Sequence, residues 1–379
     1  MTVRDLVDRA CIAGVGATPQ GKLPGQSGDD LAVWAVREAL ADAGIHKTEI
    51  DALIVQRSFC GQGDVRDVGH RLAIDPALAF NVGYQGEALL TAIMLVAGGL
   101  AQVAALAYGT NQRTNRNRFA QPAVHVGGNF EAVYGLASPA STAAFNFRRR
   151  MHDFGATEAQ LGTLVVAQSR AAALNPLAVY RDLVTIEQYL AAPYLIAPLR
   201  MYDFCMVSDG GFATIVVSPE RARDLPKAAV WISGLGFQAS FTELEHPDAM
   251  YLPAHVPNAA RLWESTDVTR SDIDVLYVQD PYTPSTLSML EGYGFCERGS
   301  AHEWIQDGRI ELGGELPLNV NGGQNRMTYM IGWQHTYDAV KQVRDEAQER
   351  ARQVPHCRVA MCVYSSGVGQ ETASVILRS

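Results

Sequence analysis

Apolar and polar positions along the N-terminal half predict strands and helices in alternation. The apolar runs at 10–16 and 50–56 are typical of buried strands. Between them, apolar side chains recur at helical spacing after Asp29 and Asp30, which predicts a capped amphipathic helix ending near Gly44. This alternation is typical of an α/β fold.

The segment 86–96 is apolar on nearly every side, so it predicts a helix without a solvent-facing surface, and 103–108 predicts another buried strand. A helix that is apolar all round lies inside the protein. A helix buried between layers implies a sandwich with more layers than a doubly wound sheet. Two glycines and a glutamine interrupt the apolar stretch 88–107, which argues against a membrane span.

Three pairs of segments resemble each other in the same order along the two halves of the chain. The clearest pair reads IDALIVQ and IDVLYVQ, with five of seven positions identical. Such ordered matches predict the duplication of one α/β unit, so we expect domains over 1–222 and 223–379. The pairs are 50–56 with 273–279, 81–82 with 319–320, and 208–211 with 366–369.

Composition narrows the class of protein. Of 379 residues, 47% are hydrophobic and 19% are charged, a balance typical of a globular protein. The 31 basic and 40 acidic side chains give a net charge of −9, so nucleic acid is not an expected partner. We expect Arg148, Arg149 and Arg150 to lie on a solvated helix face.

The six cysteines are dispersed, with neither a CxxC motif nor a Cys/His spacing for zinc, and no apolar leader opens the chain. We therefore expect free thiols, no bound metal, no membrane association and a cytoplasmic location. Cys60 lies in a glycine-rich loop and is the one cysteine that we consider as a candidate nucleophile. Cys205 is expected to be a small buried hydrophobe.

Four motifs are spaced along the chain: SDGGFA at 208–213, GFCERG at 294–299, NVNGG at 319–323 and SSGVGQ at 365–370. In this order they resemble the thiolase superfamily, and most closely its sterol-carrier or lipid-transfer-protein type. The resemblance implies a duplicated five-layer α-β-α-β-α sandwich with two mixed sheets, a homodimer and acyl-CoA substrates. Coenzyme A is then part of the substrate, and no other cofactor is expected.

Three catalytic positions of that family carry other side chains here. Gly83, or Val82 with a one-residue slip, stands where the resemblance places the nucleophilic cysteine. Tyr329 replaces the histidine that follows the Asn-x-x-Gly-Gly turn, and Ser365, flanked by Tyr364, replaces a second cysteine. Condensation through a cysteine-bound acyl group is therefore not expected.

A thioester pocket without a nucleophile can still stabilise an enolate. Backbone N–H groups at Gly83 and in the Gly367 turn are candidate oxyanion donors, and Tyr364 and Ser365 are candidates for that or a supporting role. Retro-aldol cleavage of a β-hydroxyacyl thioester additionally needs a base for the hydroxyl and an acid for the α-carbon.

Tyr282 and Tyr329 are the candidate base and acid. Tyr282 follows the second copy of the repeated strand, whose end faces the pocket in the family. A phenol has an ordinary pKa of about 10, nearer to that of an alcohol than a carboxylate's, and donors or cations lower it. The chain resembles the steroid side-chain-cleaving aldolases, which lack the cysteine and rely on such tyrosines. Which tyrosine is base and which is acid stays open.

The resulting hypothesis is an acyl-CoA lyase that cleaves a bulky β-hydroxyacyl-CoA to a ketone and a shortened acyl-CoA, with a steroid side chain as one candidate. The alternatives are a non-catalytic thiolase-fold scaffold or acyl-CoA-binding subunit, and a decarboxylating or hydrolytic relative. The resemblance also implies a small OB-fold partner with a zinc ribbon. The loop 111–118, with three arginines, either receives coenzyme A phosphates or faces solvent.

Overall fold

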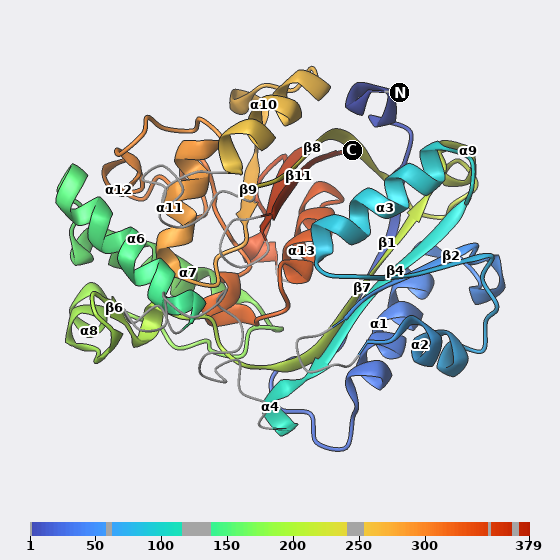
Figure 1. The fold of residues 1–379 in the computed structure, drawn as a ribbon, viewed down its shortest axis with the longest axis horizontal. Coiled ribbons are helices and arrows are strands. Elements are labelled where there is room, and N and C mark those ends of the chain that lie inside the picture. The colour runs from blue at the N-terminus through green and yellow to red at the C-terminus, as the bar shows by residue number, and fades with distance from the viewer. Residues whose placement is uncertain (1, 58–62, 116–137, 241–253, 348–349, 366–370) are drawn as a thin grey trace.

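The computed structural model builds the chain from two similar halves (Figure 1). It describes residues 2–57, 63–115, 138–240, 254–347, 350–365 and 371–379. The N-terminal half contains β1 (Cys11–Ala17), α1 (Gly28–Ala43), β2 (Ala52–Gln56), α2 (Val65–Leu72), β3 (Leu78–Val82), α3 (Gln85–Ala97), β4 (Val103–Asn111) and β7 (Asp209–Val217). The C-terminal half contains β8 (Val230–Ala239), α10 (His255–Ser265), β9 (Val275–Val278), α11 (Thr283–Gly292), α13 (Trp333–Val343), β10 (Val359–Ser365) and β11 (Glu371–Arg378).

The strands of the two halves form one nine-stranded sheet in the order β3-β2-β4-β7-β1-β8-β11-β10-β9. The N-terminal half-sheet ends at β1 and the C-terminal half-sheet starts at β8. These strands pair only at Cys11 with Trp231 and Ile12 with Val230. The two mixed sheets implied by the resemblance are therefore present as half-sheets joined at a short seam.

The two half-sheets have the same strand order. In each, two antiparallel pairings are followed by a parallel one: β1-β7-β4-β2 corresponds to β8-β11-β10-β9. β3 adds a further parallel strand, and its counterpart is a single parallel bridge between Leu276 and Leu318. The structure thus contains the duplicated α/β unit, while the domain boundary after residue 222 stays a prediction.

Helices separate and cover the half-sheets, which gives five layers. α1 and α2 pack on the outer face of the N-terminal half-sheet, and α10 and α11 pack on the outer face of the other. α3 and α13 each contact strands of both halves and form the central layer (Figure 1). The helix predicted over 86–96 is α3. This helix is not buried on every side, because Met94 is 47% exposed.

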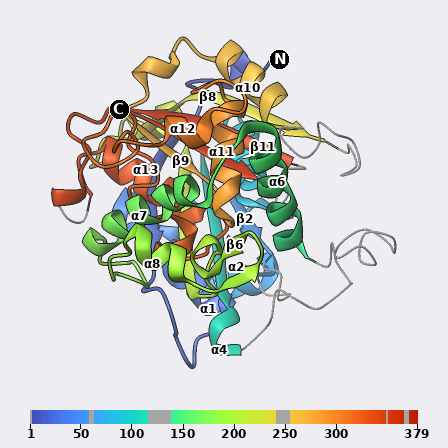
Figure 2. The ribbon, with the colours of Figure 1, turned by 90° about the vertical axis from the view of Figure 1, so that its left-hand side faces the viewer.

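A long insertion between β4 and β7 lies against the C-terminal half. Figure 2 shows its helices α6, α7 and α8 next to the helices of that half. Arg150 of α6 is buried and donates to the Glu291 carboxylate of α11, with one N···O distance of 2.9 Å. The expectation of a solvated face is therefore wrong for Arg150, because its partner comes from the other half. The insertion contains α4 (Gln112–Asn115), α6 (Pro139–Phe154), α7 (Glu158–Leu174), α8 (Ile186–Ala191), β5 (Tyr194–Ile196) and β6 (Leu199–Arg200).

The predicted amphipathic helix is α1, with an N-terminus different from the one expected. Ser27 is the cap: its hydroxyl accepts from the Asp30 N–H at 3.1 Å. The Asp30 carboxylate in turn accepts from the Ser27 N–H at 3.0 Å, which closes a capping box. The acidic residue therefore lies inside the first turn, where it also stabilises the helix dipole.

Candidate active site

The candidate site forms where β9 of the C-terminal half ends. Asn319 fixes this strand end: its side chain accepts from the Val278 N–H at 2.9 Å and donates to the Val278 carbonyl at 3.0 Å. The chain then turns through glycines, as the sequence predicts. A Cβ at Gly323 would lie 2.3 Å from an Asp280 carboxylate oxygen, so only glycine fits there.

Tyr282 lies directly before α11, with most of its ring buried. Its backbone pairs with Phe204, and the two rings meet edge to face with centroids 5.7 Å apart. The next residue, Cys205, donates its backbone N–H to the Pro281 carbonyl at 2.8 Å. The insertion therefore holds Tyr282 in place from the side.

Tyr329 is 7% exposed and is held by the SDGG motif. Its backbone N–H donates to the Ser208 hydroxyl at 3.2 Å, and that hydroxyl lies 2.7 Å from the Thr328 hydroxyl. Thr328 in turn donates to Gln20 at 3.0 Å. A Cβ at Gly210 would lie 2.2 Å from this Gln20 oxygen, which explains one glycine of the motif.

The two predicted tyrosines share one electrostatic environment. Burial raises the pKa of Tyr329 well above its ordinary value, and the nearby Cys205, Tyr108 and Tyr282 raise it further. Burial, and then Cys205, raise the pKa of Tyr282. The expectation that donors or cations lower these pKa values is therefore wrong. Both phenols are neutral near pH 7 because ionisation would leave a charge in an apolar site.

Cys205 lies beside both tyrosines, closer to the chemistry than the sequence suggests. Burial raises the pKa of its thiol to about 12, with a smaller contribution from the Asp280 carboxylate. A thiol with this pKa is not a nucleophile at neutral pH. The residue as a whole is half-buried, and it packs against the hydrophobic core. Cys60 lies outside the described residues.

A buried polar network that sequence reasoning missed adjoins Tyr282. The Asp280 carboxylate accepts from the Gln168 side chain at 2.5 Å and the Gln324 N–H at 3.0 Å. The His335 Nε2 atom lies 3.5 Å from the same carboxylate, and its Nδ1 atom lies 3.1 Å from Asn321. His335 is therefore a hydrogen-bonding side chain, and the network brings together residues around 168, 280, 321–324 and 334–335.

Two buried glutamines next to this network keep polar atoms free. The Gln279 carbonyl oxygen accepts from the Ser365 N–H at 3.1 Å, but its Nε2 has no partner within the described part of the chain. Neither side-chain polar atom of Gln324 has one there either. Buried amides are normally satisfied, so these groups indicate room for water or a polar ligand. The sequence signal for Gln279 was its place at the end of the repeated strand.

The remaining predicted residues divide between a buried network and the surface. The Tyr364 hydroxyl lies 2.7 Å from the Thr336 hydroxyl, and burial raises its pKa well above the ordinary value. Ser365 is also buried. Gly83 is exposed, and its N–H donates to the Glu87 carboxylate at 2.7 Å, so in this arrangement it is not free to bind an oxyanion. Gly367 lies outside the described residues.

Two further properties concern only the residues that the structure describes. They contain no group of three potential metal ligands. None of their helices combines the length and the apolar character that crossing a membrane requires.

Comparisons with known proteins identify the family of the chain. Residues 242–379 match the family model described as "Thiolase C-terminal domain-like". The chain is similar to a steroid side-chain-cleaving aldolase of Thermomonospora curvata, at 34% identity over 97% of each chain. It is also similar to a 17-hydroxy-3-oxo-4-pregnene-20-carboxyl-CoA lyase of Mycobacterium tuberculosis, at 33% identity over 98% of this chain and 100% of that one.

The fold resembles a solved structure titled Ltp2-ChsH2(DUF35) aldolase, with a TM-score of 0.87 and 32% identity over 99% of this chain and 98% of that one. A human mitochondrial 3-ketoacyl-CoA thiolase has a TM-score of 0.73 at 14% identity over 99% of each chain. The second likeness concerns the fold alone.

Proposed function

Because the chain belongs to the thiolase superfamily, among its steroid side-chain-cleaving aldolases, we propose that it cleaves a bulky β-hydroxyacyl-CoA into a ketone and a shortened acyl-CoA. The observation that carries this proposal is the pair of neutral, buried tyrosines, Tyr282 and Tyr329, beside a thiol that is not ionised. Such a site suits proton transfer and does not suit thiolysis.

The proposed reaction needs no external reagent. The bond between the α- and β-carbons breaks, and its electron pair passes to the thioester as an enolate. The β-hydroxyl loses its proton and becomes the ketone carbonyl. A proton returns to the α-carbon, so the two products together have the composition of the substrate.

Two neutral phenols can carry out this exchange as a relay. One phenol takes the hydroxyl proton while it passes its own proton to the second phenol, and the second phenol delivers its proton to the α-carbon, so both phenols end neutral. Neither phenolate then has to persist in a site where burial disfavours it. We assign Tyr282 and Tyr329 to these two positions and leave their order open.

The thioester oxygen needs a hydrogen-bond donor while the enolate exists. We propose the free Nε2 of Gln279 for this role, because it is buried and its own carbonyl oxygen is fixed by Ser365. Gly83 and Gly367 remain candidates, with Gly83 requiring release from Glu87. Tyr364 and Ser365 would support the pocket.

The proposed substrate is a CoA thioester of a steroid-derived acid, of the kind named for the aldolase and lyase relatives. Coenzyme A enters as part of the substrate, and the chain holds no other cofactor in this proposal. We also propose a homodimer. β3 supports it, because it ends the sheet and presents an edge that another strand can pair with.

A small OB-fold, zinc-ribbon protein is the proposed further partner, with a cytoplasmic location for the assembly. The solved structure that this chain resembles is named Ltp2-ChsH2(DUF35) aldolase, and this paired name supports a two-component enzyme. If the chain is instead a non-catalytic scaffold subunit, it should not cleave the acyl-CoA with or without a partner.

The test is to incubate the purified chain, alone and with a candidate partner, with a tertiary β-hydroxyacyl-CoA. The expected result is release of a ketone and a shortened CoA ester in equal amounts, measured by mass spectrometry. The matched control is the same thioester without its β-hydroxyl, which should stay intact. Binding of the substrate without products in both arms would favour the scaffold.

A further inference from the structure

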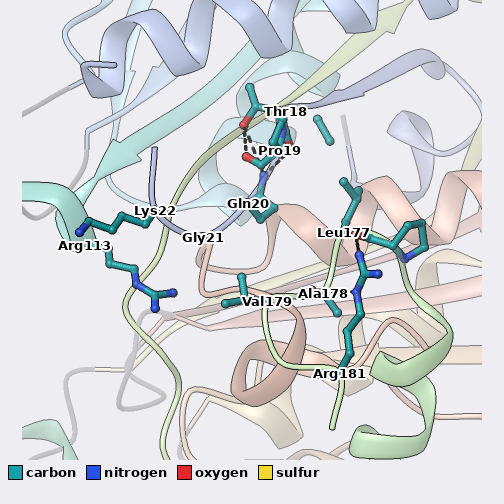
Figure 3. Close-up of a pocket in the computed structure, with 12 residues that line it drawn as sticks. Thr18, Pro19, Gln20, Gly21, Lys22, Arg113, Leu177, Ala178, Val179 and Arg181 are labelled. Carbon is teal, nitrogen blue, oxygen red and sulfur yellow. Dashed lines mark hydrogen bonds between the residues drawn. The ribbon is translucent and has the colours of Figure 1, made fainter. Parts of the chain in front are cut away.

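The loop after β1, residues 18–21, lies against the SDGG motif and lines the pocket shown in Figure 3. The Thr18 N–H donates to the Gly211 carbonyl at 3.0 Å. Gly21 and Asp209 exchange two backbone hydrogen bonds, of 3.0 and 2.7 Å. In return, the Gly211 N–H donates to the Thr18 hydroxyl at 2.9 Å. The loop is therefore held to the motif at both of its ends.

The half-buried side chain of Gln20 is fixed at both ends of its amide. Its Nε2 atom donates to the Thr18 carbonyl at 2.8 Å (Figure 3), and its Oε1 atom accepts from the Thr328 hydroxyl at 3.0 Å. An amide nitrogen only donates and a carbonyl only accepts, so the Gln20 oxygen has to face Thr328. The anchored loop thus presents a hydrogen-bond acceptor in one fixed orientation.

This acceptor sets the direction of the two hydroxyls behind it. The single hydroxyl proton of Thr328 goes to Gln20, so Thr328 can only accept from the Ser208 hydroxyl, which lies 2.7 Å away. Ser208 uses its own proton for that bond and accepts from the Tyr329 N–H at 3.2 Å. The chain of hydrogen bonds therefore runs one way, from the Tyr329 backbone to Gln20.

Burial makes this chain sensitive to the loss of any member. Ser208 and Thr328 are 0% exposed, so solvent does not replace a missing partner. A buried hydroxyl that loses its partner pays the full cost of desolvation, unlike a hydroxyl at the surface. Gln20 precedes Thr328 by 308 residues and belongs to the other half of the molecule. The N-terminal half therefore reaches the Tyr329 backbone through this chain.

We propose that Gln20 is a positioning residue for Tyr329, acting through the Thr328 and Ser208 hydroxyls. The inference rests on the proposed function, which makes Tyr329 one of the two proton-transfer groups. A displacement of about 1 Å in a reacting group can cost about a hundredfold in rate. Loss of the chain should therefore lower kcat while it leaves substrate binding, and so KM, nearly unchanged.

The substitutions Thr328→Val and Thr328→Ser form a matched pair, because valine keeps the shape of threonine without its hydroxyl and serine keeps the hydroxyl. T328V and Q20L should each lower kcat about ten- to a hundredfold with KM within about twofold, and T328S should keep kcat within about threefold. The double variant Q20L/T328V should lose no more than the larger single loss, because both substitutions break one chain. Gln102→Leu, at an exposed residue just before β4, is the control and should behave as the wild type does.

Hydrogen exchange at the Tyr329 amide gives a second measurement that does not depend on turnover. The Ser208 hydroxyl protects this N–H, so exchange should be at least about tenfold faster in Q20L and T328V than in the wild type and T328S. Exchange of the amides in β2 should not change, which separates a local effect from general unfolding.

The outcomes distinguish this role from the function on which it rests. An enzyme that cleaves the substrate with equal kcat in the wild type, Q20L and T328V would overturn the positioning role alone. Additive losses in the double variant, or unchanged exchange at the Tyr329 amide in both single variants, would also overturn it. Faster exchange at this amide in a chain that cleaves no β-hydroxyacyl-CoA would refute the function and support the anchoring of the Tyr329 backbone.

Discussion

The two halves of the molecule have the same strand order and opposite chemical character. In the N-terminal half, the turn after β3 is exposed, and the Gly83 N–H is already occupied by Glu87. In the C-terminal half, the matching turn leads to Tyr329, which is 7% exposed. The two halves therefore share one strand order, but the proposed proton-transfer groups come from the C-terminal half.

The repeated strand shows where the halves part. Its last residue is a glutamine in each copy, and each keeps a buried Nε2 without a partner in the described chain. The Gln56 oxygen accepts from the Trp333 indole at 2.6 Å, and the Gln279 oxygen accepts from the Ser365 N–H at 3.1 Å. The next side chains differ: Arg57 is exposed and pairs with the half-buried Asp64, whereas Asp280 is buried in the site.

The largest expected effect is on the two tyrosines. Tyr329→Phe and Tyr282→Phe should each lower kcat by about 10²–10⁴-fold, the usual contribution of a general acid or base. Tyr84→Phe, which alters the tyrosine before α3 in the other half, should leave kcat within about twofold. Steady-state kinetics and melting temperatures of all three variants separate catalysis from folding. Near-normal turnover by either C-terminal variant would refute the assignment.

The buried ion pair between the insertion and α11 should matter next. Glu291→Gln leaves Arg150 buried and without a counter-charge, which should cost about 3–5 kcal/mol of unfolding free energy. Asp64→Asn removes the exposed pair with Arg57 in the N-terminal half and should cost less than about 1 kcal/mol. Urea unfolding measures both, and equal costs would contradict the burial seen for Arg150.

Gln56 and Gln279, which end the two copies of the repeated strand, give a smaller expected difference between the halves. Gln279→Leu should lower kcat by about 10²-fold, because it removes the proposed donor to the thioester oxygen. Gln56→Leu should leave kcat almost unchanged and cost about 1 kcal/mol of stability, for the hydrogen bond to Trp333. If the two variants lose the same activity, Gln279 has no special role.

The smallest expected effect concerns pH. Because the pKa values of Tyr282 and Tyr329 are raised, neither phenol ionises below its ordinary pKa. kcat should therefore be flat between about pH 7 and about pH 9, and any loss from phenol ionisation should appear only above about pH 10. A kcat that rises about tenfold per pH unit across this interval would instead indicate a resident phenolate base.

The sequence by itself determined the α/β alternation, the duplication and the absence of a nucleophile where the family has its cysteine. These features depend on local periodicity and on motifs, which a linear chain displays directly. It also indicated Tyr282 and Tyr329, through resemblance. It could not give the direction of their pKa shifts, because that direction depends on burial.

Only the tertiary structure decided the surroundings of each side chain. Arg150 is buried because Glu291, far along the chain, meets it across a helix interface. Asp280 and His335 come together in the same way. Burial, hydrogen bonding and charge pairing act through space over a few ångström, so residues far apart in sequence set the chemistry that the local pattern leaves open.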